Sequence, residues 1–582
     1  MMSKLPVIVG LGGINAAGRS SGFHGYKRIV SDSLKGEIMQ NTWADLCNRM
    51  GIIRNVESMT ASHIECAQNG TLIRKITRFD TQKVPINKIL TDIDNNSDRL
   101  LNSMHTSLSV TSAGQLPEGF EIGDLYNAIS HPRGLRLTVY GASDLLNSIG
   151  ISWSDITALV KPDQISVYAG SSLGQIDRLS MAGLIGNPLN GSRVSSKMLP
   201  LSMADMPAGF INSYIINNLG TTSANLGACA SFLYNLKQGI NDIKQGKSKI
   251  CLVGCAEAPV VPAIIEGFRA MSALAEDHQL CELDGTDIVN HRRACRPFST
   301  NVGFTIAESA QFVLLMSDDL ALQCGVNILG SVPDVFVNSD ANKKSISSPG
   351  IGNYITMMKA ASLTNHLLDG KLRHSYVQAH GTGTPQNRVT ESHIINEVAK
   401  TFGLNNWDVT AIKAHIGHSI AAAAGDQLAC VLGVWQYGWI PGITTIDHIA
   451  EDVHASNLNI LMQNKFVGEY GENMQATIIN AKGFGGNNAS AVILSPQQTM
   501  QMLGKKHGRS SISSYHKRNE IVKSKSEEQD RAICRGEESI VYNFGNAVLQ
   551  PSDIQLSRQE VRLNGVKQPI RLPTAEEFSE FL

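Results

Sequence analysis

Residues 225–231 read NLGACAS, and this stretch places Cys229 where a strand-like run gives way to a helical pattern. The polar run 217–224 precedes it, and apolar residues at helical spacing follow it as far as Ile240. We therefore expect the Cys229 thiol at the first turn of a helix, where unpaired N–H groups and the helix dipole favour the thiolate. Since a free cysteine with a pKa of about 8.5 is only about 3% ionised near neutral pH, this position predicts a nucleophile.

A buried, unreactive side chain is the alternative interpretation of Cys229, because most free cysteines pack as small hydrophobes. The chain has ten cysteines. Cys251 and Cys255 fall in an apolar run that predicts a buried strand, and no CxxC pair occurs. The cysteine pattern therefore predicts neither a disulfide framework nor a zinc site.

Composition bounds the class of protein. With 50 basic and 51 acidic residues, the chain has no bulk charge that would attract nucleic acid. No apolar stretch approaches the roughly 20 residues of a membrane helix. The start, Met1-Met2-Ser3-Lys4 and then an apolar strand, lacks the pattern of a signal peptide. The 52 glycines, 42% hydrophobic and 17% charged residues predict a cytoplasmic α/β protein with a large core and a surface partly covered by a second subunit.

The chain divides near residue 497. Before it, apolar strands and amphipathic helices alternate without a linker, which predicts one layered α/β body. Residues 504–535 are rich in Lys, Arg, Ser and Glu and predict an exposed or loosely ordered segment. An alternative is that the basic strip 505–525 docks an acidic partner. Short β-like runs within 538–572, such as 539–542, predict that the tail folds back onto the body.

The body shows a weak internal duplication. Cys229 opens a helix in the first half, His418 opens another in the second, and a buried strand follows each, at 250–254 and 476–480. If a pseudo-twofold axis relates the halves, both helix starts converge at the centre and Cys229 faces His418. The predicted divisions are an N-terminal half, 1–323, with an enlarged insertion at about 25–165, a C-terminal half, 324–497, and an extension, 498–582. The insertion includes the polar run 91–99 and is expected to shape the substrate entrance or a dimer interface.

Three further motifs offer what a thiol nucleophile needs. HGTGTP begins at His380, after the apolar strand 376–379, on the side of an open sheet where ligands bind. KAHIGH runs from Lys413 to His418. GFGGNN, at 483–488, has glycines that let backbone N–H groups approach a substrate closely. Taken singly, a turn histidine, a surface lysine and a tight glycine turn are the simpler interpretations.

Together and in this order, the four motifs resemble the β-ketoacyl-acyl-carrier-protein synthases of the thiolase superfamily, over about residues 5–495. The stretches 296–298 (RPF) and 303–304 (GF), with Glu308, extend the resemblance. The strings VGLGGINAAGR at 9–19 and PQNRVTES at 385–392 look like the FabY-type synthases, which prime fatty-acid synthesis from acetyl-CoA. The resemblance implies a thiolase-like fold, with two pseudo-duplicated halves in a five-layered α-β-α-β-α body, and a homodimer.

The resemblance also implies the roles of the reacting groups. Cys229 attacks an acyl thioester, and the N–H groups of Cys229 and Phe484 hold the oxyanion, while Phe484 also gates the acyl pocket. Neutral His380 and His418 donate Nε2–H to the enolate that forms when malonyl-carrier loses its carboxylate. Lys413 keeps a neighbouring histidine neutral by its charge.

The remaining implied roles concern substrate and support. The substrates bring their own pantetheine thioesters, on CoA and acyl carrier protein, and the resemblance implies no metal or redox cofactor. Substrate contacts are implied for Thr382, Thr384, Gly485 and Gly486, and structural support for Glu308 and Glu391.

Three positions depart from the family pattern. Arg388 stands eight residues beyond His380, where the family has an aspartate, and Ser299 also replaces an aspartate. The family glutamate some nine residues beyond His418 has Asp426 as its nearest candidate here. These changes affect supporting ion pairs, and so the rate and pH profile more than the type of reaction.

The leading hypothesis is decarboxylative Claisen condensation of a short primer, acetyl-CoA, with malonyl-acyl carrier protein. An elongating synthase that uses longer acyl-carriers is the main alternative. A non-catalytic partner subunit would lack the nucleophile, and a thiolase would normally carry a second cysteine where this chain has 483–485. Chain length and the choice between CoA and carrier as primer stay open.

Overall fold

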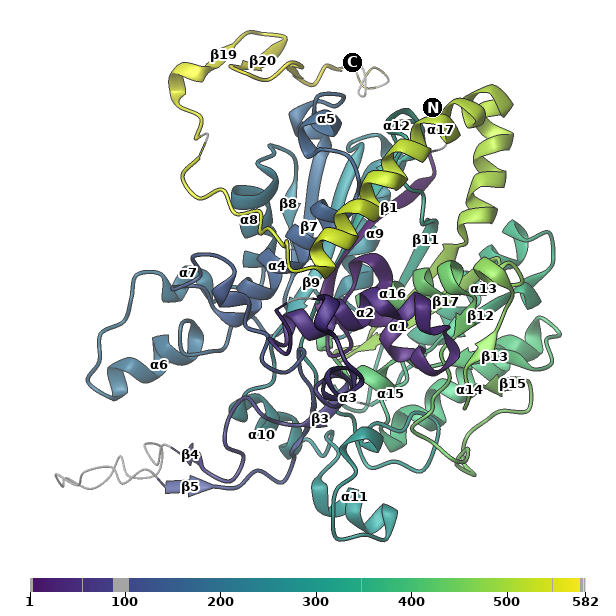
Figure 1. The fold of residues 1–582 in the computed structure, drawn as a ribbon. Coiled ribbons are helices and arrows are strands. Elements are labelled where there is room, and N and C mark those ends of the chain that lie inside the picture. The colour runs from purple at the N-terminus through teal and green to yellow at the C-terminus, as the bar shows by residue number, and fades with distance from the viewer. Residues whose placement is uncertain are drawn as a thin grey trace.

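The computed structural model (Figure 1) describes residues 4–54, 56–86, 104–346, 348–546, 548–575, 579 and 581. The polar run 91–99 of the predicted insertion, and Met1 to Ser3 at the start, lie outside the described residues. Of the helices in the described part, none is both long and apolar enough to cross a membrane.

One hydrogen-bonded sheet runs through the body in the order β15-β13-β12-β17-β18-β11-β1-β10-β9-β7-β8. The N-terminal strands are β1 (Pro6–Asn15), β7 (Ile165–Gly170), β8 (Thr222–Ser223), β9 (Ile250–Glu257) and β10 (Ser309–Ser317). The C-terminal strands are β11 (Gly330–Ser339), β12 (Ser375–Gln378), β13 (Trp407–Thr410), β15 (Leu458–Ile460), β17 (Ala476–Gly483) and β18 (Asn487–Leu494).

The strand directions repeat between the two halves. In the first, β7 runs parallel to β9, β9 antiparallel to β10, and β10 antiparallel to β1. In the second, β12, β17, β18 and β11 repeat these directions in the same order. The halves join where β1 meets β11 at only two residue pairs. The predicted duplication is confirmed.

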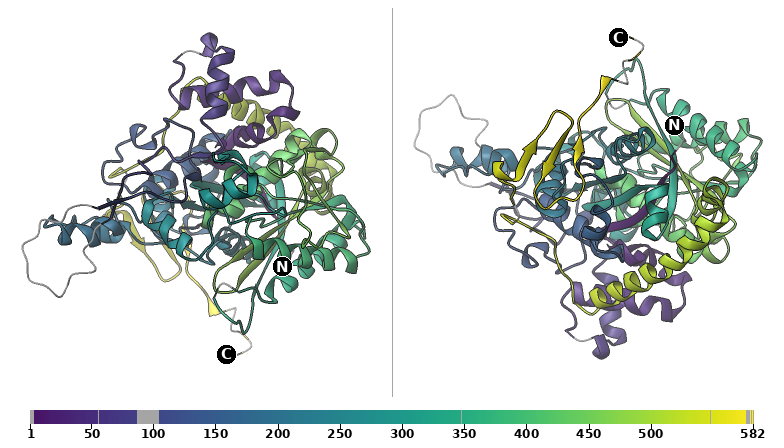
Figure 2. Two further views of the ribbon diagram at one scale, coloured as in Figure 1. Left: turned by 90° about the horizontal axis from the view of Figure 1, so that it is seen from below. Right: turned by 90° about the horizontal axis from the view of Figure 1, so that it is seen from above.

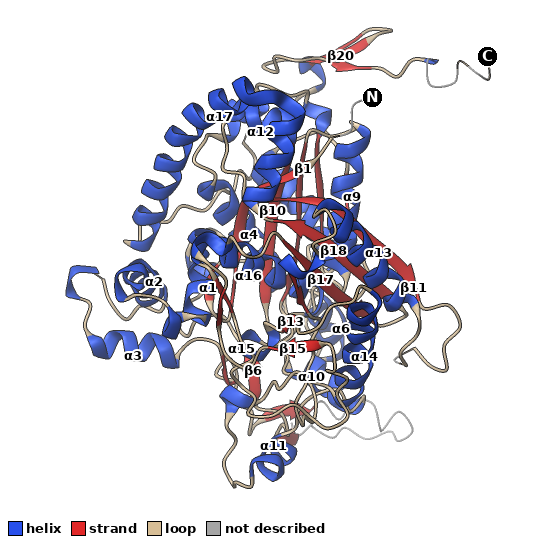
Figure 3. Ribbon diagram, turned by 90° about the vertical axis from the view of Figure 1, so that its right-hand side faces the viewer, coloured by secondary structure: helices blue, strands red, loops and turns tan. Residues whose placement is uncertain are grey.

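Helices cover both faces of the sheet (Figure 3), as a central group between its two halves and an outer group on each half. The central helices α9 (Ser231–Gln245) and α16 (Ala423–Tyr437) contact each other and strands of both halves. The outer helices of the N-terminal half are α4 (Arg133–Ser148) and α8 (Met206–Ile211). Those of the C-terminal half are α13 (Gly352–Leu367) and α14 (Pro385–Thr401). The expected five layers are therefore present.

Strand β9 shows why the layers form. Its side chains alternate between faces, so Ile250 and Leu252 join the outer cluster with α4, whereas Cys251 and Cys255 join the central cluster with α9. Both cysteines are fully buried, as predicted for this strand. A strand that is apolar on both faces needs helices on both sides, which gives the layered body.

The predicted insertion holds both peripheral and core elements. Peripheral are α2 (Gly36–Arg49), α3 (Ala61–Asn69) and the strand pairs β3 (Ile73–Lys75) with β6 (Ser112–Gly114) and β4 (Val84–Ile86) with β5 (Met104–Thr106). Helix α1 (His24–Ile29) packs on α16, with Tyr26 in the central cluster. Helix α4 instead packs on β1 and β10.

The remaining labelled elements lie along the whole chain. They are β2 (Gly18–Arg19), α5 (Trp153–Thr157), α6 (Met181–Leu189), α7 (Met198–Leu201), α10 (Pro262–Ala270), α11 (Asp277–Asp284), α12 (Asp318–Cys324), α15 (Lys413–Ile416), β14 (Trp439–Ile440) and β16 (Lys465–Phe466).

The sequence predicts that residues 504–535 are exposed or loosely ordered; most of them are exposed, but the segment is helical and not loosely ordered. Helix α17 (Pro496–Cys534), broken at Gly508 (φ 80°), lies over the first half and contacts α2, α4 and α12 (Figure 2). It buries few apolar side chains, among them Leu503, Tyr515 and Ile533. Because so much of its contact is polar, composition alone did not reveal it.

The tail folds back, as predicted, over 538–544. The Glu538 carboxylate bonds to Arg49, and the ring of Tyr542 packs against His131 and Tyr214. The run 539–542 has no regular secondary structure and is not part of a sheet. Beyond it, β19 (Ile554–Leu556), β20 (Glu560–Leu563) and β21 (Ile570–Arg571) form a small sheet that stands off the body (Figure 1).

Candidate active site

Cys229 lies on a sharp turn just before α9. Ala228 has a positive φ of 50°, Ala230 is the helix cap, and α9 begins at Ser231. The Ser231 hydroxyl accepts from Gly227 N (2.9 Å) and donates to Ala228 O (2.6 Å), which holds the turn. The thiol therefore precedes the first helical turn instead of lying within it, a correction to the sequence prediction.

The charge state of Cys229 also differs from the prediction. Burial raises the pKa of the thiol to about 12, an effect that the nearby Lys413 charge opposes and the Glu257 carboxylate reinforces. The side chain is 8% exposed, and withdrawal from water penalises the thiolate more than its surroundings favour it. The resting enzyme therefore holds a thiol, and the proton must leave as the new bond to sulfur forms.

His380 follows β12 and is held through its main chain. The Glu391 carboxylate accepts from His380 N (2.7 Å) and Gly381 N (2.8 Å), and Lys413 Nζ donates to His380 O (2.6 Å). The side-chain Nδ1 of His380 is buried without a hydrogen-bond partner among the described residues. The turn is thus rigid, whereas no protein bond selects the imidazole tautomer.

His418 faces His380, with ring centroids 5.5 Å apart and planes at 89°. The backbone N–H of Ile420 donates to His418 Nδ1 (3.2 Å), so the proton of the neutral ring sits on Nε2. Burial, reinforced by Lys413, lowers the pKa of both histidines well below the usual value. Both rings are neutral near pH 7, but the predicted Nε2–H tautomer is selected by a bond only in His418.

Lys413 acts from behind this pair. It is 1% exposed, lies outside the cavity lining, and reaches the site through the carbonyl of His380. Burial lowers the pKa of Lys413, while the Glu391 charge raises it. Its expected role beside a histidine matches this placement.

The glycine turn meets the nucleophile turn. A Cβ added to Gly483 would lie 2.2 Å from Gly227 O and 3.1 Å from Cys229 N, so only glycine fits there. Phe484, which is 36% exposed, follows immediately, and its ring lies 6.4 Å from that of Phe268. This brings the main chains expected to form the oxyanion hole together.

One cavity of about 390 Å³ joins these groups. Cys229, His380 and His418 line it together with Thr382 and Thr384, two of the predicted substrate contacts. Gly485 and Gly486 do not line it; they form the β17–β18 turn, with φ of 85° and 86°. The lining is apolar at Phe268, Phe304 and Ile420 and polar at Asp340, Lys343, Asn387, Thr390, Lys482 and Asn488.

Sequence reasoning missed the polar side of this cavity. Lys482 directly precedes the GFGG motif, so its position next to the glycine turn was the available signal. Asp340 and Lys343 come from a loop after β11 that carries no motif. Only the fold brings these residues to the cavity.

The supporting carboxylates occupy three separate places. Glu391 anchors the His380 turn, as predicted. Glu308 instead accepts from Arg133 Nε (2.7 Å) and Leu116 N (3.0 Å), and so ties the insertion to β10 away from the cavity. Asp426, buried, accepts from four neutral side chains: Asn15, Ser309, Gln311 and Ser419.

The other departures also have partners. Arg388 forms an ion pair with Asp452 (2.8 Å) on a surface loop, and Ser299 lies 3.4 Å from His448 Nε2. These contacts lie outside the cavity lining.

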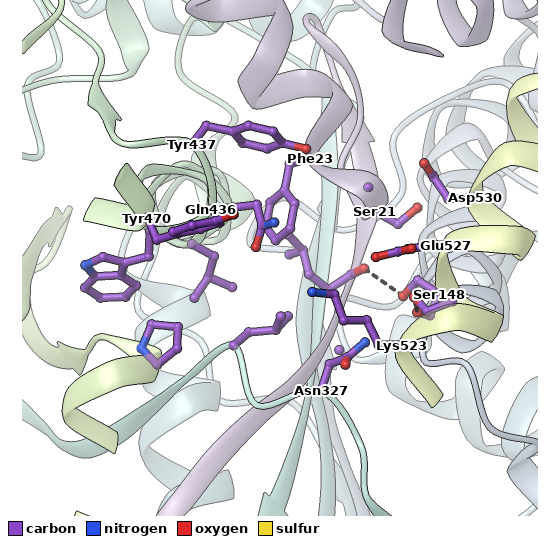
Figure 4. A pocket seen from close by; sticks show the side chains of 18 of the residues that line it. Ser21, Phe23, Ser148, Asn327, Gln436, Tyr437, Tyr470, Lys523, Glu527 and Asp530 are labelled. Carbon is purple, nitrogen blue, oxygen red and sulfur yellow. Dashed lines mark hydrogen bonds between the residues drawn. The ribbon is translucent and has the colours of Figure 1, made fainter. Parts of the chain in front are cut away.

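A larger cavity of about 780 Å³ lies apart from this site (Figure 4). It is bounded by β1, the end of α16 and α17, and the side chains of Phe23, Tyr437, Gln436 and Lys523 line it. None of the four motifs contributes to its wall. Its size alone therefore assigns it no chemistry.

One group of side chains has the composition of a metal site. Ligand atoms of His24, Asp45 and Cys534 lie within 4.8 Å of one another. The Arg19 guanidinium lies among them, 2.8 Å from Asp45 Oδ1 and 3.4 Å from Cys534 Sγ. Because this fixed positive charge would repel a metal ion, the group is better explained as an ion-pair network.

The fold and this site define a thiolase-like condensing enzyme. The model of the beta-ketoacyl synthase N-terminal domain matches residues 76–321, and that of the C-terminal domain matches 329–447. The chain is 41% identical to beta-ketoacyl-[acyl-carrier-protein] synthase FabY of Pseudomonas aeruginosa over the full length of both proteins. It belongs to the β-ketoacyl synthase family.

Solved structures agree. The crystal structure of the noncanonical ketosynthase FabY from P. aeruginosa superposes with a TM-score of 0.94 at 40% identity, covering 100% of this chain and 99% of that one. Among sequence relatives, a 3-oxoacyl-[acyl-carrier-protein] synthase 2 of Staphylococcus aureus is 25% identical over 68% of this chain and 91% of its own length. The AntDE:AntF complex, at 17% identity and a TM-score of 0.58, covers 85% of this chain and 100% of that one, and shares the fold.

Proposed function

We propose that this chain is a FabY-type β-ketoacyl-acyl-carrier-protein synthase that starts fatty-acid synthesis by condensing acetyl-CoA with malonyl-acyl carrier protein. The observation that carries the proposal is the convergence of Cys229, His380 and His418 on one cavity. The full-length relationship to FabY supports the same activity.

The first step is acyl transfer. Cys229 Sγ attacks the acetyl thioester carbon, its proton passes to the departing CoA sulfur, and a new thioester forms on the enzyme. The developing oxyanion accepts from the backbone N–H groups of Cys229 and Phe484. Removing one such donor typically costs about 100- to 1000-fold in rate.

The second step forms the carbon–carbon bond. The thioester carbonyl of the malonyl group accepts hydrogen bonds from His418 Nε2–H and from neutral His380. The C–COO⁻ bond of the malonyl group then breaks, and CO₂ leaves. The resulting enolate carbon attacks the acetyl-Cys229 carbonyl, the Cys229 sulfur leaves and is reprotonated, and a 3-oxoacyl thioester remains on the carrier. Neutral imidazoles suit this role because they donate hydrogen bonds to the enolate oxygen. A charged imidazolium would be acidic enough to protonate the enolate instead.

The packing around the nucleophile supports a short primer. Cys229 belongs to an apolar cluster with Phe268, Phe304 and Ile420. The rings of Phe268 and Phe304 lie 5.3 Å apart, edge to face. We expect a two-carbon acyl group to need less rearrangement of this cluster than a long chain.

Acyl carrier protein, a homodimer and a cytoplasmic location complete the proposal. The FabY relative is named for its carrier substrate, and the AntDE:AntF structure holds an acyl-carrier protein with its ketosynthase. Strand β8 ends the sheet, and Leu219 and Leu226 beside it are 48% and 40% exposed. A second copy that covers this edge would bury both side chains.

The deciding experiment supplies malonyl-acyl carrier protein with either acetyl-CoA or acyl-carriers of graded length and reads the product by mass. We expect acetoacetyl-carrier from acetyl-CoA, no product from Cys229→Ala, and normal product from the exposed control Cys66→Ala. Preference for long acyl-carriers would identify an elongating synthase instead. Condensation by the folded Cys229→Ala variant would overturn the mechanism.

A further inference from the structure

Lys482 places a cation on the wall of the reaction cavity. It lies on β17, two residues before Phe484, and its side chain lines the cavity with Cys229 and His380. Its ammonium donates to Asn387 Oδ1 at 3.4 Å and to Thr390 Oγ1 at 3.3 Å. Both contacts are long, and both acceptors are neutral.

No carboxylate of the described residues forms a direct ion pair with Lys482. Asp340, the one acid among the described residues of the lining, accepts from Gly352 N (2.9 Å) and Asn488 Nδ2 (2.7 Å) and pairs with Lys343 (3.2 Å).

Glu391, the next nearest acid, is equally committed. Its two oxygens accept four bonds at 2.7–2.8 Å, from the main chain of His380 and Gly381 and the side chains of Asn387 and Asn480. Burial lowers the pKa of Lys482, while the charges of Glu391 and Asp340 raise it from a distance. The cavity wall therefore offers an ammonium that has no direct ion pair among the described residues.

We propose that Lys482 binds the carboxylate of the malonyl extender, an inference that rests on the proposed function. The extender is the reactant with an anionic group at its reacting end, whereas an acetyl primer has none. With the malonyl thioester carbonyl at His380 and His418, the carboxylate has an ammonium available on the same cavity wall. A charge-assisted hydrogen bond there selects a malonyl over an acetyl thioester as the second substrate.

This contact acts on binding more than on the chemical step. As CO₂ leaves, the negative charge moves from the carboxylate to the enolate oxygen at the histidines, so the bond to Lys482 is strongest before decarboxylation. An interaction that is stronger in the ground state than in the transition state lowers KM but also raises the barrier of the chemical step, so removing it raises KM and does not reduce kcat. Lys482 is thus assigned to recognition of the extender.

The test measures KM and kcat for malonyl turnover in Lys482→Met and Lys482→Arg, with the exposed Lys371→Met as matched control. Two substrates separate the possible anions: malonyl-phosphopantetheine, and malonyl-pantetheine, which has no phosphate. Loss of a hydrogen bond between charged groups predicts an increase in KM of about 10- to 100-fold for Lys482→Met with both substrates. Lys482→Arg should recover most of the loss, and in Lys482→Met the KM should rise while kcat does not fall.

Other outcomes decide against the proposal. An increase in KM confined to the phosphorylated substrate would assign Lys482 to the phosphate, and an unchanged KM would remove it from substrate recognition. If Lys482→Met does not fold, the KM and kcat of Lys482→Gln are measured with the same two substrates. Failure of the proposed function is distinguishable, because wild-type protein would then not turn over either malonyl substrate.

Discussion

At the scale of single residues, Lys413 governs the charges of the site. Its ammonium is buried and bonded to His380 O, and its charge lowers the pKa of His380, of His418 and of Cys229. The same cation therefore keeps two donors neutral and eases loss of the thiol proton. These effects require a protonated lysine, which the neighbouring Glu391 charge supports.

Lys413→Met should shift the pH dependence of malonyl-carrier decarboxylation. With the charge removed, the pKa of His380 rises towards its ordinary value, so the inactive imidazolium persists to higher pH. We expect the acid limb of the pH–rate profile to move to higher pH, with an overall loss of about 10-fold or more. Lys400→Met, an exposed change at the end of α14, serves as the control; an acid limb at the wild-type pH in Lys413→Met would contradict the assignment.

At the scale of elements, α17 is held by buried charges. Arg19, fully buried on β2, bonds to Asp45 (2.8 Å) and to Asp530 of α17 (2.7 Å). His24 of α1 bonds to the same Asp530 carboxylate at 3.1 Å. Burial lowers the pKa of His24 to about 4, and the contacts of Asp530 with His24 and Arg19 lower the pKa of that carboxyl, so it is ionised. The network links the start of the chain to a segment more than 500 residues away.

Asp530→Asn should loosen this helix. The substitution removes the negative charge that faces Arg19 and His24, while Arg19 keeps Asp45 as a partner. We expect a loss of about 2 kcal/mol in the free energy of unfolding, typical of a hydrogen bond to a charged group. Chemical denaturation measures the loss, and hydrogen exchange locates it in α17.

The exposed neighbour Glu528 provides the control for that experiment. Glu528→Gln changes the same charge on the same helix turn without a buried partner and should stay within about 0.5 kcal/mol of wild type. Equal stability of the two variants would show that the buried network does not hold α17.

At the scale of the whole molecule, the tail has two parts with different relations to the body. Residues 538–544 pack against α4 and its neighbours through Glu538, Val541 and Tyr542. The hydrogen bonds of the described residues in 548–575 stay within the tail. Only the first part is therefore expected to contribute to the stability of the monomer.

Two truncations separate these parts. A chain that ends at Leu549 loses the small outer sheet. Its free energy of unfolding should stay within about 1 kcal/mol of that of the full chain. A chain that ends at Arg535 also loses Glu538, the partner of buried Arg49, and should lose about 3 kcal/mol or more. Thermal unfolding at matched concentration measures both; a large loss from the shorter deletion would show that the outer sheet is bound to the body or to a second subunit.

Much of the fold and of the site could be predicted from the chain. The glycine and histidine motifs identified the family, and with it the duplicated five-layered body. They also identified Cys229, His380, His418, Lys413 and Phe484 as neighbours. Such motifs are local: a turn that needs glycine at 483, or a histidine at a strand end, is written in adjacent residues.

Other properties depended on residues far apart in the sequence. The Cys229 thiol is protonated because several segments bury it, and α17 is ordered because Arg19 and Asp45 meet Asp530. Lys482 has no direct ion pair among the described residues because Glu391 and Asp340 are bonded to other groups.

The amino-acid sequence by itself thus determined which groups react and the class of fold that carries them. Only the tertiary structure decided how those groups are charged, which of them are held in place, and what else lines their cavity. The physical reason is that burial and ion pairing act through space: they depend on what packs around a side chain, which no local pattern records.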